Sequence, residues 1–194
     1  MPAIARDSLL TLEAYAKERA AFRARVLAHK RNRIVHVGPH VTLLFEDELT
    51  IRYQIQEMLR IEKTFDESGI QQEVDAYNPL VPDGNNLKAT MLLEYEDANE
   101  RHAALAELRG IEDCVFLRVA GFEAVQAVAD EDLVRENDAK TSAVHFVRFE
   151  LTPPMIEAFK GGKPVSLRVD HANYQADVAA LSPLVQQALA SDFA

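Results

Sequence analysis

The chain has 194 residues, and 48% of them are hydrophobic, so it is long and apolar enough to fold around a core. Its 21 Lys and Arg residues against 31 Asp and Glu residues give a net charge of −10, which argues against general nucleic-acid binding. The one cysteine, Cys114, allows no intrachain disulfide or thiolate cluster, and no apolar run reaches signal-peptide or membrane-spanning length, so we expect a cytoplasmic protein that contacts no membrane.

The first predicted element is an amphipathic helix over about residues 12–30. Leu12, Phe22 and Val26 are spaced as on one helical face, and basic side chains occupy the other faces. Residues 1–33 carry eight basic and three acidic side chains, a net charge of +5, whereas the rest of the chain carries −15. The simplest interpretation is that this basic segment lies on the acidic body or in solvent; binding of an anion or an acidic partner is the alternative.

The next predicted elements are two short strands, 34–37 and 41–45, which carry two of the six histidines. The first strand is rich in β-branched residues, and the second is a buried apolar run. A Gly-Pro dipeptide bends the chain between them, because proline has no backbone N–H to donate. His36 and His40 flank this bend, which frees them from the strict alternation of a strand.

A helix is predicted to start at Leu49, with one apolar face and one face of groups that form hydrogen bonds. The second face carries Tyr53, Gln56, Glu57 and Arg60. Such a density of polar groups predicts a cleft wall that is at least partly buried against the second lobe of the chain. The alternative is a solvated face with an intrahelical Glu57–Arg60 pair at i,i+3.

The second half of the chain changes to strands with few helices between them, a pattern that favours an antiparallel sheet over a doubly wound one. We predict the α+β class, with a helical N-terminal half and a mainly antiparallel β-sheet in the C-terminal half. The chain is expected to form a single domain, 1–194, with a helix-rich lobe at 1–78 and a sheet-rich lobe at 88–194. The remaining predicted elements are helix 66–77, strand 89–95, a helix between Asp97 and Gly110, strands 115–119 and 122–128, a charged loop at 130–140, strand 143–151, helix 153–161, strand 165–169 and helix 182–190.

The sequence has no nucleotide-cofactor motif, because it contains neither a Walker loop nor a Gly-x-Gly-x-x-Gly segment after a strand. It does offer mixtures of histidine and carboxylate, which suit a mononuclear iron, zinc or manganese ion. If the helix from Leu49 packs back along the preceding strand, His36, His40 and Glu57 should share one pocket and serve as metal ligands. Further ligand candidates are Glu46, Glu73 and His171.

The polar helical face also predicts a ligand site without a metal. Arg60 and Tyr53 could hold an anionic group, because a guanidinium forms charge-assisted hydrogen bonds with carboxylates and phosphates. The candidate ligand-binding residues are Tyr53, Gln56, Glu57, Arg60 and Glu73.

Two segments of the chain are specific enough to compare with known families: VGPHVTLLFE at Val37–Glu46 and YQIQEMLRIE at Tyr53–Glu62. With these segments the chain resembles the bacterial domain-of-unknown-function family numbered 3501, and the resemblance covers nearly the whole chain. Members of that family look to be encoded near rubrerythrin-like and iron–sulfur oxidoreductase proteins, so the resemblance implies a redox or iron-related context and assigns no residue roles. The match continues at Glu73, Tyr77, Asn78 and Leu80 and in segments 89–91, 142–146 and 169–171.

Three functions remain open from the sequence. The first is an accessory or partner protein of a rubrerythrin or iron–sulfur redox system, with a polar ligand pocket and with the redox centre on the partner. The second is an enzyme with a mononuclear metal held by histidines and carboxylates. The third is a small-anion binding module. The sequence leaves open whether the chain is an enzyme and whether it forms an oligomer.

Overall fold

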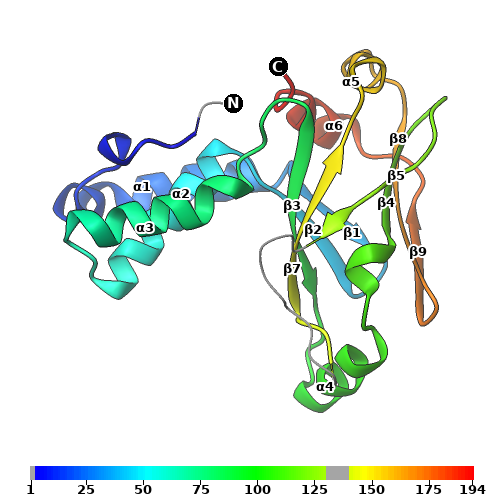
Figure 1. Cartoon of the computed structure of the whole chain (residues 1–194), viewed down its shortest axis with the longest axis horizontal. Coiled ribbons are helices and arrows are strands. Elements are labelled where there is room, and N and C mark those ends of the chain that lie inside the picture. The colour runs from blue at the N-terminus through cyan, green and yellow to red at the C-terminus, as the bar shows by residue number, and fades with distance from the viewer. Residues whose placement is uncertain (1–2, 130–139) are drawn as a thin grey trace.

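The computed structural model describes residues 3–129 and 140–194. Helices predominate in the N-terminal half of the chain and antiparallel sheets in the C-terminal half, so the predicted α+β class is confirmed. Three N-terminal helices lie side by side and project from one side of the sheets (Figure 1). They are α1 (Leu12–Lys30), α2 (Glu48–Glu62) and α3 (Glu67–Tyr77), and we call them the helical arm.

Each helix of the arm begins at a residue whose side chain accepts a backbone N–H of the first turn. Thr11 caps α1, Asp66 caps α3, and Asp47 forms a capping box with Thr50 at the start of α2. The apolar faces of α2 and α3 then meet in a small core of their own. This core contains the buried side chains of Ile4, Ile51, Ile55, Leu59, Val74 and Val81.

Residues 3–11, the N-terminal segment, cross the arm and include the short 3₁₀ helix η1 (Arg6–Ser8). Two side-chain amides bind the backbone of this segment at both ends. Asn78, in the 3₁₀ helix η2 (Asn78–Leu80), accepts from the N–H of Ile4 at 2.8 Å and donates to its carbonyl at 3.0 Å. Gln56 does the same for Leu10, at 2.8 and 3.3 Å. The segment is therefore part of the arm and not a loose extension.

The strands form two antiparallel sheets instead of one. The first has the order β1-β2-β3-β7-β6 and the second the order β5-β4-β8-β9. Apolar side chains from both sheets share one large core. The first sheet consists of β1 (Ile34–Val37), β2 (Val41–Phe45), β3 (Asn86–Leu93), β7 (Val144–Glu150) and β6 (Val128–Ala129), and the second of β5 (Val125–Gln126), β4 (Val115–Val119), β8 (Val165–His171) and β9 (Tyr174–Val178).

One predicted strand is divided between the two sheets. Residues 122–128 were expected to form a single strand, but β5 pairs with β4 while β6 pairs with β7. The division occurs at Ala127, which is buried and donates its N–H to the carbonyl of Val115 at 2.8 Å. The small side chain lets the chain cross the core as it passes from one sheet to the other.

The other helices lie at the two ends of the sheets, with α4 at one end and α5 and α6 at the other (Figure 1). Their bounds are Ala98–Glu107 for α4, Pro153–Lys160 for α5 and Pro183–Ala190 for α6, and the 3₁₀ helix η3 spans Ile111–Cys114. Apart from Lys140, the charged loop expected at 130–140 lies outside the described residues. In the part of the chain that the structure describes, none of the helices has the length and apolar character needed to cross a membrane.

A buried cluster of charges joins the arm to the sheets. The side chain of Arg33 has no exposed surface, and it forms ion pairs with Asp192 and, at 3.1 Å, with Asp47. Asp47 also lies 2.5 Å from the Nε2 atom of His29, in the last turn of α1. The cluster therefore connects the end of α1, the start of α2, the start of β1 and the C-terminal residues.

Tyr174 of β9 connects the two sheets through its hydroxyl group. This hydroxyl donates to the carbonyl of Val37 at 2.6 Å and accepts from the N–H groups of His40 and Val41 at 3.1 and 3.2 Å. It lies against Gly38, which has a φ of +78°, and a Cβ atom there would be only 2.5 Å from the tyrosine oxygen. Only glycine satisfies both the backbone conformation and the close approach.

We expect Gly38→Ala to lower the free energy of unfolding by at least about 2 kcal/mol more than Gly121→Ala, because Tyr174 must move and lose hydrogen bonds. Gly121 is a matched control, since its φ is +92° and a Cβ there meets nothing within 4 Å. Urea unfolding of the two variants measures the difference. Equal losses would show that backbone strain alone, and not the contact with Tyr174, accounts for the cost at Gly38.

Burial raises the pKa of the Asp192 carboxyl from 3.8 to about 7, although Arg33 opposes the shift. A carboxyl whose pKa is raised in the folded state stabilises the fold at low pH and loses that contribution as the pH rises through the folded pKa. We expect Asp192→Asn to remove this loss, so that the stability of the variant relative to wild type increases between about pH 5 and about pH 8. Urea unfolding at both pH values measures it, and a constant difference between the two proteins would contradict the expectation.

Candidate functional site

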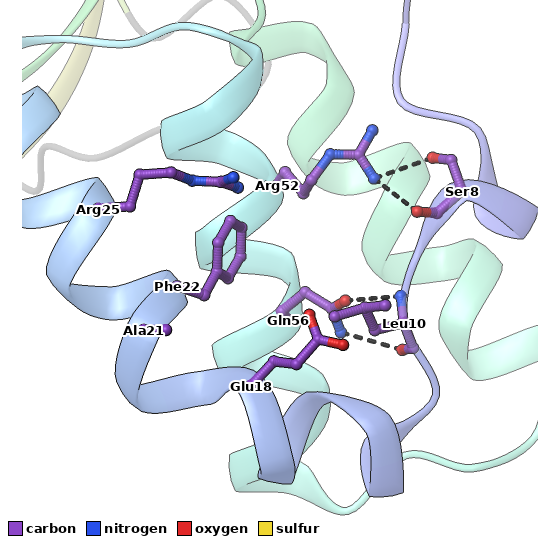
Figure 2. Close-up of a pocket in the computed structure, with 8 residues that line it drawn as sticks. All are labelled: Ser8, Leu10, Glu18, Ala21, Phe22, Arg25, Arg52 and Gln56. Atoms are coloured by element: carbon purple, nitrogen blue, oxygen red, sulfur yellow. Dashed lines mark hydrogen bonds between the residues drawn. The ribbon is translucent and has the colours of Figure 1, made fainter.

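A pocket of about 430 Å³ opens where the N-terminal segment crosses α1 and α2 (Figure 2). This volume lies in the range of cavities that bind small molecules. The wall combines apolar, aromatic and charged groups, with positive charge in excess. The residues that line the pocket are Ser8, Leu10, Glu18, Ala21, Phe22, Arg25, Arg52 and Gln56.

Helix α1 contributes one stripe of the wall. Glu18, Phe22 and Arg25 recur at steps of four and three, so they lie on the same face of the helix. The guanidinium carbon of Arg25 lies 4.8 Å from the centroid of the Phe22 ring, which is a cation–π contact. The ring of Phe22 is itself held edge-on by Tyr15 and Tyr53, at centroid distances of 6.0 and 5.9 Å. The aromatic floor of the pocket is therefore fixed by packing.

Helix α2 contributes Arg52 and Gln56, which are one turn apart. Gln56 is almost completely buried, and its amide holds the backbone of Leu10. Arg52 donates from Nε to Glu48 at 2.7 Å and from another nitrogen to the carbonyl and hydroxyl oxygens of Ser8, at 2.8 and 3.0 Å. Both side chains thus fix the N-terminal segment as a wall of the pocket, and Arg52 adds positive charge there.

Two charged side chains of the wall have no hydrogen bond or ion pair within residues 3–129 and 140–194. They are Arg25 and Glu18. Figure 2 shows them on opposite sides of Phe22, with Arg25 above the ring and Glu18 turned toward Leu10 and Gln56. An unpaired cation beside an aromatic ring in a preformed pocket is suited to binding an anion that has an apolar part.

The predicted site residues Glu57 and Arg60 form a structural ion cluster instead. Glu57 accepts from Tyr15 at 2.6 Å, from Arg19 at 2.7 and 2.8 Å and from Arg60 at 3.1 Å. These contacts, with Arg19 as the largest influence, lower the pKa of Glu57 from 4.5 to about 2. This polar face of α2 packs against α1, and not against the sheet-rich lobe as expected. Both carboxylate oxygens of Glu57 already accept hydrogen bonds.

His36 and His40 do not lie with Glu57. The Nδ1 atom of His36 lies 2.8 Å from the hydroxyl of Thr42, and that of His40 lies 2.9 Å from the carbonyl of Glu94. His40 also stacks on Tyr95, with ring centroids 4.0 Å apart. Within the described ranges, no group of three or more His, Cys, Asp or Glu side chains is arranged to hold a metal ion.

The reason for this separation is the direction of α2. The bend that carries the histidines precedes β2, whereas Asp47 starts α2 beyond the opposite end of β2, about 17 Å away for five residues. We expected α2 to return along β2. Instead it packs between α1 and α3 and carries Glu57 away from the bend.

The other predicted ligand residues also lie in separate places. Glu46 is buried and accepts from Thr50 and Thr90 at 2.5 and 2.6 Å. On α3, burial raises the pKa of Glu73, with a smaller effect from the charge of Glu62. The Nε2 atom of His171 lies 3.1 Å from the carbonyl of Arg109.

Of the five predicted ligand-binding residues, Gln56 alone is in the set that lines the pocket. Tyr53 supports the pocket indirectly by packing on Phe22. The residues that sequence reasoning missed are Glu18, Phe22 and Arg25 of α1. Their common helical stripe was a usable signal, but the sequence analysis considered anion binding only for the basic segment as a whole and singled out none of these three residues.

We expect Arg60→Ala to lower the free energy of unfolding by no more than about 1 kcal/mol, because its side chain is 40% exposed and Arg19 still pairs with Glu57. Glu57→Ala should cost roughly 1–3 kcal/mol more, since it leaves the buried hydroxyl of Tyr15 without its acceptor. Because the pKa of Glu57 is lowered, its contribution is present above about pH 4.5 and disappears toward about pH 2. Urea unfolding at neutral and acidic pH checks both points, and equal losses in the two variants at neutral pH would contradict them.

Comparison with known proteins places the chain in a family. The family model described as "Protein of unknown function (DUF3501)" matches residues 3–193. Among solved structures, the chain is similar to the crystal structure of a novel protein of unknown function from Burkholderia pseudomallei K96243, with 58% sequence identity, a TM-score of 0.95 and coverage of 100% of both chains. No curated protein matches. Because the family match covers almost the entire sequence, the chain belongs to the DUF3501 family.

Proposed function

We propose that this protein is a small-molecule binding module whose pocket takes an organic anion with an apolar part. The observation that carries the proposal is the position of Arg25. Its guanidinium stands over Phe22 in a pocket of about 430 Å³, and within the described residues it has no anionic partner. Arg25 is exposed, so its guanidinium is accessible to an anion that enters the pocket.

The chemistry of the wall selects the ligand class. A guanidinium presents donors in a planar fork that matches two oxygens of a carboxylate or phosphate. Phe22, Leu10 and Ala21 supply apolar surface next to this fork. Arg52 raises the local positive potential, although Glu48 and Ser8 occupy most of its donors. A short-chain or aromatic carboxylate would fit both parts of the wall.

The two other functions considered from the sequence have less support. A mononuclear metal enzyme would need the predicted histidines and Glu57 in one place, and they are held by different partners. Partnership with a redox protein stays a prediction from the family resemblance, since none of the described contacts bears on it. The pocket therefore favours the small-anion interpretation.

Ligand-observed NMR titration with caproate, benzoate and hexyl phosphate tests the proposal. We expect wild type to bind at least one of these probes and Arg25→Gln to bind it about tenfold more weakly, because a charge-assisted hydrogen bond is lost. Arg23→Gln is the matched control, since Arg23 is exposed on the same helix outside the pocket and should leave the affinity unchanged.

Two results would overturn the proposal. One is that none of the three anions binds wild type. The other is that Arg25→Gln and Arg23→Gln bind equally well, which would place the anion elsewhere on the basic surface of α1.

A further inference from the structure

Glu18 is the second unpaired charge of the pocket, and the donors around it are already engaged. Arg19 donates to Glu57, Arg52 donates to Glu48 and Ser8, and the amide of Gln56 donates to Leu10. Glu18 itself has no hydrogen bond or ion pair in the part of the chain that the structure describes. Like Arg25, Glu18 is exposed, so its carboxylate is accessible to a cationic group of a ligand in the pocket.

Arg25 and Glu18 are too far apart along α1 to pair with each other. They are seven positions apart, which corresponds to about 10 Å along the helix axis at about 1.5 Å per residue. Side chains on a helix reach each other at separations of three or four positions. Figure 2 shows the ring of Phe22 between them, so the pocket has a positive end, an aromatic middle and a negative end.

We infer that the ligand of this pocket is a small zwitterion, with a carboxylate or phosphate at Arg25, an amine at Glu18 and an apolar spacer on Phe22. This inference rests on the proposed function and names its ligand class. ω-Amino acids and short peptides have this chemistry, with opposite charges at the two ends of an uncharged spacer. The pocket also discriminates against the alternatives, because a dianion would meet Glu18 and a diamine would meet Arg25.

Three probes with the same carbon chain test the inference: ε-aminocaproate, which carries both charges, caproate, which carries the acid alone, and hexylamine, which carries the amine alone. Each is titrated by ligand-observed NMR at low and moderate salt. We expect ε-aminocaproate to bind wild type about fivefold more tightly than caproate, the gain of one partly exposed ion pair. Added salt should reduce this ratio.

Two variants assign the two ends. Glu18→Gln should abolish the preference for ε-aminocaproate over caproate while leaving the affinity for caproate unchanged or increased. Arg25→Gln should weaken both acids and leave hexylamine unaffected. Glu157→Gln on α5 is the control, because this exposed carboxylate lies outside the pocket and should leave all the ratios as in wild type.

The outcomes separate the two proposals. If wild type binds caproate and ε-aminocaproate equally, the zwitterion inference is overturned and the anion-binding function stands. If neither acid binds, the proposed function itself fails. If ε-aminocaproate is preferred and Glu18→Gln retains the preference, the amine lies elsewhere and the assignment to Glu18 is wrong.

Discussion

The buried charge of Arg33 is the constraint around which the molecule is arranged. An unpaired guanidinium without contact to water would cost several kcal/mol, so the fold must bring carboxylates to it. One of them, Asp47, starts α2, and the other, Asp192, comes 159 positions later in the sequence. Because Arg33 directly precedes β1, meeting this one requirement places the root of the helical arm, the edge of the first sheet and the C-terminus next to one another.

The helical arm holds the pocket outside the main core, because the arm has contacts of its own that fix its structure. The arm has its own small apolar core, and side-chain amides of Gln56 and Asn78 bind the backbone of the N-terminal segment across it. Several charged groups of the arm pair with one another, as Glu57 does with Arg19 and Arg60. Arg25 and Glu18 are unpaired among the described residues, and they differ from the other unpaired charges of α1 in lining the pocket.

Local sequence patterns predict the bounds of helices, which depend on neighbouring residues. They do not predict which elements pack together, because those contacts join residues far apart in the sequence. Helix 12–30 and the helix with Pro183 in its first turn are correct at both ends, because periodicity and caps determine them. Strand β9 was missed although its sequence carried a signal, because Tyr174, Ala176 and Val178 pack on the core and alternate with the exposed Gln175 and Asp177. The predicted site residues of α2 lie on a face that packs on α1, and that pairing depends on contacts about forty positions apart in the sequence.

The hydroxyl of Tyr174 has a further consequence for the margins of the sheets. β1 and β9 are edge strands of their respective sheets, and strands at an edge present unpaired backbone groups on which other chains can assemble. Here the two edges contact each other, and the tyrosine oxygen takes up backbone groups of Val37, His40 and Val41 around the turn after β1. A side chain of the second sheet thus occupies backbone groups at the margin of the first, and its loss would leave them open to pairing with another chain.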